Sequence, residues 1–85
     1  MTLEECGKNL RSKIDENLNL KYKIDAAIAD LAKGLNLKPV IETLIETCLQ
    51  LNVDCESLIK ANSLELESDK RKEVQKFIFG YTEKE

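Results

Sequence analysis

The sequence contains no histidine, and this absence removes the side chain most often used in general acid–base catalysis. Ser–His and Cys–His nucleophile pairs and mixed Cys/His zinc sites are excluded for the same reason. Only three glycines occur, and the glycine-rich loops that bind phosphates in nucleotide-binding proteins are missing. We therefore expect no enzymatic activity, no cofactor and no bound metal ion.

Other absences concern the cellular compartment. Three cysteines at irregular spacing do not make a disulfide framework, because an odd number cannot pair completely. No apolar run approaches the length of a membrane-spanning helix, and the acidic start Met1-Thr2-Leu3-Glu4-Glu5 lacks the apolar segment of a secretory signal. These features predict a cytoplasmic protein without a membrane partner, in a compartment that keeps thiols reduced.

What the chain does contain is a mixture of apolar and charged residues typical of globular proteins. Of its 85 residues, 42% are apolar and 34% are charged. The net charge of -3 favours no particular class of partner. A chain of this length predicts a single domain over residues 1–85, with one modest core.

Apolar residues recur at helical spacing through nearly the whole chain. Thr2 and Glu5 form a capping box, which predicts a helix start. Two apolar stripes follow, at Leu3, Cys6, Leu10, Ile14 and Leu18, and then at Leu20, Ile24, Ile28, Leu31 and Leu35. Asn17 and Asn19 are weak helix formers and predict a break near residue 19. The stripes are nearly in phase, so one long helix through residue 33 is the alternative.

A glycine and a proline separate the second stripe from the next helix. Gly34 adopts positive φ without strain and predicts the end of the preceding helix. Pro39 suits a first helical turn, where its missing N–H costs nothing. The helix over residues 40–51 is apolar over roughly half its circumference, so we expect it at the centre of the fold. Its apolar residues are Val40, Ile41, Leu44, Ile45, Cys48, Leu49 and Leu51.

Two further helices are predicted in the last third of the chain. Asp54 is a suitable N-cap for a short helix over roughly residues 55–61. The last helix starts at Ser63 or Ser68 and reaches about Tyr81. Its apolar stripe consists of Leu66, Val74, Phe77, Ile78 and Tyr81. The sequence therefore predicts an all-α protein, a small bundle of four to five helices with short loops.

Residues 28–50 have the outline of a degenerate helix-turn-helix, the motif that places its second helix in the major groove of DNA. Gly34 lies two residues before the expected position of the turn glycine. The polar face of the second helix carries Glu42 and Glu46, whereas affinity for phosphates depends on Lys and Arg. A glycine-capped corner inside a bundle is the preferred interpretation, and DNA binding is the alternative.

The cysteines are expected to have two different roles. Cys6 and Cys48 fall on the predicted apolar stripes and should pack in the core. Cys55 falls in the first turn of the short helix, where the peptide dipoles can lower a thiol pKa, so it is the candidate redox thiol. The neighbouring carboxylates of Asp54 and Glu56 oppose that effect.

The C-terminal aromatic segment indicates a contact between molecules. Phe77 and Tyr81 share one face with Val74, whereas Phe79 lies about 140° away from it. An aromatic residue outside the buried stripe is typical of a dimer or partner contact, unless the helix turns by Gly80 and Phe79 folds back. A small core without disulfides or metal also favours a homodimer. The candidate contact residues are Phe79, Tyr81, Val40, Leu49 and Leu51.

These features predict a small, non-catalytic regulatory, adaptor or inhibitor protein that acts by binding another protein and associates with itself. Two alternatives involve nucleic acid. One is a transcriptional regulator that binds DNA through residues 28–50. The other is an inhibitor that mimics nucleic acid through the acidic residues Glu42, Glu46, Asp54 and Glu56, although a net charge of -3 is small for that role.

Overall fold

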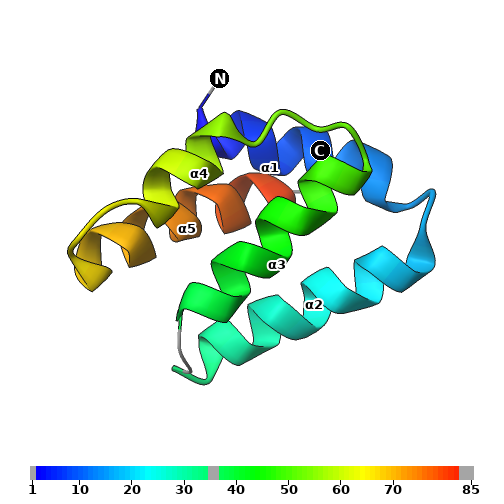
Figure 1. The fold of residues 1–85 in the computed structure, drawn as a ribbon. Coiled ribbons are helices and arrows are strands. Elements are labelled where there is room, and N and C mark those ends of the chain that lie inside the picture. Colours follow the sequence, from blue (N-terminus) through cyan, green and yellow to red (C-terminus); the bar gives the residue numbers. More distant parts are fainter. Residues whose placement is uncertain (1, 35–36, 83–85) are drawn as a thin grey trace.

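The computed structural model describes residues 2–34 and 37–82. Within them five helices follow one another: α1 (Leu3–Ile14), α2 (Leu18–Ala32), α3 (Leu37–Gln50), α4 (Glu56–Asn62) and α5 (Glu67–Thr82). The described residues contain no strand, and the all-α prediction is confirmed. The α2–α3 hairpin forms one side of the molecule, and α1, α4 and α5 form the other (Figure 1).

The junction between α1 and α2 shows why the first stripes form two helices. The Thr2 hydroxyl accepts a hydrogen bond from the Glu5 amide at 3.1 Å, and the Glu5 carboxylate accepts one from the Thr2 amide at 3.2 Å, so the capping box is confirmed. Asn17 then caps α2, because its side-chain oxygen accepts a hydrogen bond from the Leu20 amide at 3.2 Å. The break therefore lies before residue 19, and the single long helix is wrong.

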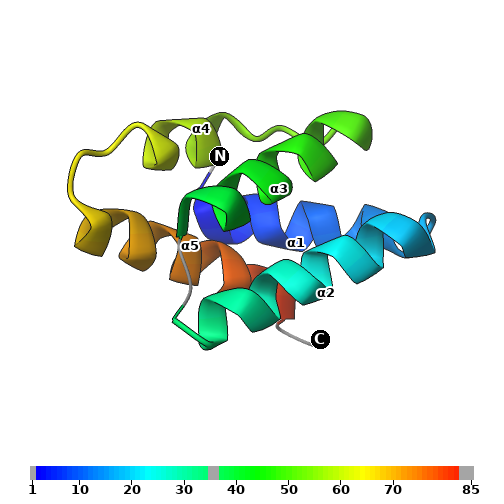
Figure 2. The same ribbon diagram turned by 60° about the horizontal axis from the view of Figure 1, so that its bottom comes forward.

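Helices α1 and α5 make the most extensive contact between any two elements, although they lie far apart in the sequence (Figure 2). A Cβ atom on Gly7 would lie 2.8 Å from the Tyr81 amide nitrogen and would collide with the Phe77 carbonyl oxygen. A Cβ atom on Gly80 would lie 2.9 Å from the Glu4 carbonyl carbon and would collide with its oxygen. Helix backbones approach this closely only where a side chain is missing, so the two glycines permit the contact.

The third helix packs against α2, α4 and α5, as expected for the most apolar helix, but its buried face differs from the predicted one. Thr47, predicted on the polar face, is 1% exposed, and its hydroxyl donates a hydrogen bond to the Thr43 carbonyl at 2.9 Å. That bond satisfies the hydroxyl within the helix, so the side chain can enter the core. Ile45 and Leu51 are only partly buried, and Leu49 is largely exposed.

The link between α2 and α3 follows the prediction where it is described. Gly34 directly follows the last turn of α2 with a φ of 78°, a conformation that favours glycine. Pro39 is in the first turn of α3, which begins at Leu37. Leu35, predicted on the second stripe, lies outside the described residues.

The starts of the two C-terminal helices differ slightly from the predicted ones. The side chain of Asp54 accepts a hydrogen bond from the Glu56 amide at 3.0 Å, so it contributes to the start of α4, although Cys55 occupies the N-cap position. Helix α5 begins at Glu67 rather than at Ser63 or Ser68. Leu66, expected on the apolar stripe of this helix, precedes the helix and is exposed. The first buried residue of α5 is Val74.

Buried side chains from all five helices form one core cluster. The cluster contains residues of α1 and α5 as well as residues of the α2–α3 hairpin, so the two sides of the molecule share one core. Across the described part of the chain, no helix combines the length and the hydrophobicity that a bilayer crossing requires.

Candidate functional site

The structure separates the five residues proposed from the sequence as a contact surface. Val40 and Tyr81 are 4% and 3% exposed and belong to the core of their own chain. Leu51 is partly buried against that core. Phe79 on α5 and Leu49 on α3 are 58% and 60% exposed. Of the five, these two can contact another molecule without rearrangement, and they lie on different helices.

Tyr81 stabilises the contact between α1 and α5. Its ring is stacked on that of Phe77, with the centroids 6.4 Å apart, and the Arg11 guanidinium lies 5.5 Å from the Tyr81 centroid. This geometry is a cation–π contact that joins the end of α1 to the end of α5. Burial raises the pKa of Tyr81, and the negative charge of Asp25 acts in the same direction.

Phe79 borders a surface hollow between α1 and α5, with a volume of about 390 Å³. The hollow is lined by Glu4, Lys72, Gln75, Lys76 and Phe79, which we call the Phe79 patch. Glu4 reaches this position because Gly80 lets the backbone of α1 lie directly against α5. The patch therefore combines an exposed aromatic ring with an acid from one helix and bases from another.

The charges of the Phe79 patch are only partly satisfied within the chain. Lys76 pairs with Glu73 at 3.1 Å, and Glu4 lies 3.8 Å from Lys8. Lys72 is exposed and forms no ion pair with any described residue. Phe79 can be identified from the sequence, whereas Glu4 and Lys72 cannot, because their proximity depends on how α1 packs against α5.

A second exposed apolar surface lies where α3 meets α4. A hollow of about 500 Å³ there is lined by Pro39, Glu42, Thr43, Ile45, Glu46 and Asn62. Leu49 is one helical turn beyond Ile45, and the exposed Ile59 is one turn before Asn62, so both border the same surface. We call Ile45, Leu49 and Ile59, with Glu42 and Glu46 beside them, the α3–α4 surface. Neither glutamate forms a salt bridge with another described residue.

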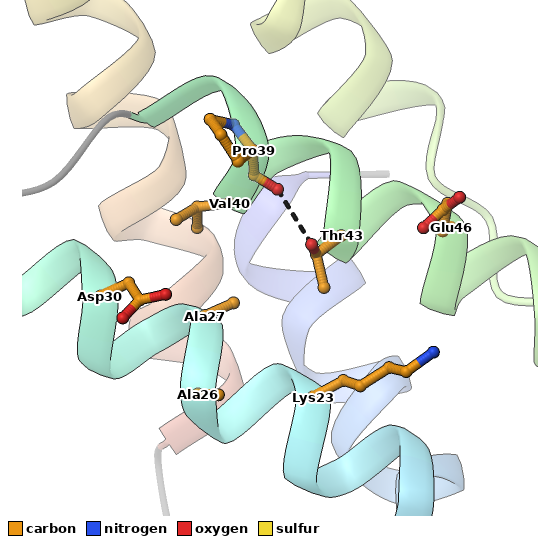
Figure 3. Close-up of a pocket in the computed structure, with 8 residues that line it drawn as sticks. All are labelled: Lys23, Ala26, Ala27, Asp30, Pro39, Val40, Thr43 and Glu46. Atoms are coloured by element: carbon orange, nitrogen blue, oxygen red, sulfur yellow. Dashed lines mark hydrogen bonds between the residues drawn. The ribbon is translucent and has the colours of Figure 1, made fainter.

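An open groove of about 620 Å³ runs between α2 and α3 (Figure 3). It is lined by Lys23, Ala26, Ala27 and Asp30 of α2 and by Pro39, Val40, Thr43 and Glu46 of α3. The Thr43 hydroxyl donates a hydrogen bond to the Pro39 carbonyl at 2.9 Å, so its proton is already bound within α3 (Figure 3). The remaining lining side chains are aliphatic or charged.

The geometry of residues 28–50 differs from that of a DNA-binding helix-turn-helix. Helices α2 and α3 lie side by side and antiparallel in both views (Figures 1 and 2), whereas the DNA-binding motif crosses its helices at about 90–120°. The exposed face of α3 carries Glu42, Glu46 and Gln50. This acidic surface and the antiparallel packing of the two helices (Figures 1 and 2) favour a structural corner over a DNA-binding motif.

Cys55, the candidate redox thiol, is 4% exposed at the N-cap position of α4. Burial raises its pKa, and the charges of Cys6 and Asp54 add to that effect, which opposes activation of this thiol. Cys6 and Cys48 are fully buried in the core cluster. All three cysteines belong to the buried core, and the Cys6 thiol donates a hydrogen bond to the Asp54 carbonyl at 3.1 Å, which nothing in the sequence spacing indicates.

Within the described residues, no group of three or more Cys, Asp or Glu side chains is arranged to hold a metal ion. Comparison with known protein families, with curated proteins and with solved structures finds no match to this chain. Its surfaces are therefore interpreted from their own geometry.

Proposed function

We propose that this protein is a non-catalytic regulator, adaptor or inhibitor that binds another protein and forms a homodimer through the Phe79 patch. The observation that carries the proposal is the exposed ring of Phe79, which lines one hollow with Glu4 and with Lys72, a base that forms no ion pair with any other described residue. An exposed aromatic residue flanked by opposite charges is typical of a specific contact surface. We place the protein in the cytoplasm, as its sequence predicts.

The Phe79 patch is complementary to a second copy of itself. A two-fold axis through the patch would bring the two Phe79 rings together and would place Glu4 of each copy opposite Lys72 of the other. Full burial of an exposed Phe contributes about 1.5–3 kcal/mol per copy, and the part of Phe79 that is already covered favours the lower end. The reciprocal charges then determine the orientation of the two copies more than their affinity.

The α3–α4 surface is the proposed binding site for a different protein. None of its residues belongs to the Phe79 patch, so a dimer leaves it free. Leu49 and Ile59 are the exposed apolar residues of this surface, and Glu42 and Glu46 add negative charge. The complementary partner would present apolar residues beside Lys or Arg.

The dimer proposal predicts that the parent protein has dimer mass at ~100 μM, a concentration high enough to populate weak dimers. Phe79→Ser should be a monomer, because it removes the central apolar contact. Glu4→Lys and Lys72→Glu should each be monomers alone, since like charges would then face each other. An equimolar mixture of these two charge variants should form a heterodimer, because both ion pairs are restored. Light scattering coupled to size exclusion measures all five samples.

Two results would contradict this arrangement in different ways. A parent of monomer mass would rule out self-association altogether. A dimer that is unchanged in Phe79→Ser, and that does not respond to either charge reversal, would exclude the Phe79 patch and leave Leu49 on α3 as the next candidate. Circular dichroism of each variant provides the control that the helices remain folded.

Binding to a protein partner predicts that a stoichiometric protein accompanies the chain when it is purified from its own cell. Leu49→Ser should lose that protein, because Leu49 is exposed on the α3–α4 surface. Leu18→Ser is the matched control, since Leu18 is similarly exposed on α2 and should retain the partner. Nucleic acid instead of protein in the eluate, lost on Gln50→Ala, would contradict the proposal and support DNA binding through residues 28–50.

The nucleic-acid mimic is the weaker alternative, because its carboxylates are not equally available. Glu56 pairs with Lys60 at 3.5 Å, and the side chain of Asp54 accepts a hydrogen bond from the backbone of α4. Only Glu42 and Glu46 remain as a pair without such partners among the described residues. Two carboxylates beside an apolar surface are complementary to a partner with apolar and basic residues. A nucleic-acid-binding protein would instead require a longer row of negative charges that imitates a chain of phosphates.

A further inference from the structure

The two hollows on either side of α3 share one wall. Pro39, Thr43 and Glu46 line both the groove against α2 and the hollow against α4. These residues follow one another at spacings of four and three along α3, so they form a ridge between the two hollows. The α2–α3 groove and the α3–α4 surface are therefore two parts of one continuous surface.

The floor of the groove is apolar and consists of small side chains. Ala27 and Val40 are 6% and 4% exposed, and the exposed Ala26 lies on the same lining. The distance between packed helices depends on the side chains between them, so alanines permit another helix to come close. Along α2 the lining runs from Lys23 to Asp30, about two helical turns or roughly 10 Å. The groove thus has the length and the floor for two turns of a third helix.

The charges around this surface are mostly negative. Asp30, Glu42 and Glu46 are exposed carboxylates, and Lys23 is the one base among the residues that line the two hollows. None of the three carboxylates forms an ion pair with another described residue. Figure 3 shows Asp30 near one end of the groove and Glu46 near the other, beside Lys23. The surface is therefore complementary to a basic partner, and it repels phosphates.

We propose that a basic amphipathic helix of the partner protein binds in the α2–α3 groove. This site depends on the proposed function, since it extends the α3–α4 surface across α3 and names the element that binds there. Both helices that border the groove satisfy their backbone hydrogen bonds internally, so an extended segment would find no sheet edge to join, whereas a helix brings its own hydrogen bonds. Apolar side chains of the bound helix would cover Ala26 and Val40, and Lys or Arg on its flanks would face Asp30 and Glu46.

The test begins with two synthetic peptides, each about five helical turns long, and the parent protein. One peptide carries Leu on one face and Lys on the other, and the second has Glu in place of every Lys. Isothermal titration calorimetry should show binding of the Lys peptide, weaker at higher salt because the carboxylates are screened. The Glu peptide should not bind. Amide signals of the groove residues on α2 and α3 should shift in the nuclear magnetic resonance spectrum when the Lys peptide is added.

Substitutions at exposed positions locate the peptide. Ala26→Gln should weaken binding of the Lys peptide about tenfold or more, because the longer side chain fills the groove. Ala29→Gln is the matched control, since Ala29 is exposed on the same helix but lines neither hollow. Asp30→Lys and Glu46→Lys should each weaken binding about fivefold or more. Glu16→Lys changes the net charge equally at an exposed position outside both hollows, and it should have little effect.

Three results would overturn the proposal. The first is a parent that binds neither peptide or binds both equally. The second is an affinity for the Lys peptide that is as high in Ala26→Gln as in Ala29→Gln. The third is a copurifying partner that Ala26→Gln retains and Leu49→Ser loses, which would exclude the groove and leave the proposed function standing. The absence of any copurifying protein would instead contradict the proposed function, while the two peptides still decide the specificity of the groove.

Discussion

The Gly80→Ala variant should unfold at a lower urea concentration than the parent, with a loss of about 2 kcal/mol or more in the free energy of unfolding. The added methyl group would meet the Glu4 carbonyl carbon at 2.9 Å and collide with its oxygen. Both belong to the backbone of α1, so neither can rotate away, and the two helices must separate. Alanine in a helix would by itself stabilise the chain by about 1 kcal/mol, so the expected loss opposes the local preference.

Gly34 provides the matched control, because a Cβ atom there meets nothing within 4 Å. Its φ of 78° is tolerated by asparagine, so Gly34→Asn should cost less than about 1 kcal/mol. A Gly80→Ala protein that is more stable than the parent would show that α1 and α5 do not approach as closely as described. Gly7→Ala should resemble Gly80→Ala, and the double variant should cost less than the sum, because the two residues share one contact.

The Leu44→Asp variant should lose its cooperative thermal transition. Leu44 is fully buried on α3, and a carboxylate there would have neither water nor a partner. The penalty of several kcal/mol is a large part of the roughly 4–13 kcal/mol that stabilises a domain of this size. Circular dichroism at the helical minimum, recorded against temperature, should show an unfolded or gradually melting chain.

Ile45 tests the direction in which α3 faces the core. It was expected in the core from the sequence, but it is only partly buried, so Ile45→Asp should destabilise the protein less than Leu44→Asp. Glu46→Ala, on the exposed face, should change the free energy of unfolding by less than about 0.5 kcal/mol. A melt of Leu44→Asp like that of the parent would show that the buried face of α3 has been misplaced.

The helices could be predicted because their signals are local. The capping box at Thr2, the helix break near Asn17 and the helix end at Gly34 depend on residues a few positions apart, and each is read from residue type and spacing. Which residues of α3 face the core was harder to predict. Thr47 can be buried because its hydroxyl is hydrogen-bonded within its own helix. Leu49 is exposed, although it is apolar and was predicted on the apolar face.

The arrangement that creates the candidate sites could not be predicted, because it depends on contacts between distant residues. In a sequence, a glycine within a helix indicates only a weaker helix. Neither Gly7 nor Gly80 shows which other helix will pack against it. The same packing brings Glu4 to the hollow that Phe79 borders. A single sequence contains the residues of these sites but not their proximity.

The dependence of α1 on α5 also determines the order of events during synthesis. The α2–α3 hairpin joins sequence neighbours, so it can form as soon as both helices have left the ribosome. Helix α1 is made before the other four described helices but has its most extensive contact with α5, the last of them. Contacts between distant residues form late, because the intervening chain must first be brought together. The Gly7 face of α1 therefore stays uncovered until α5 has left the ribosome.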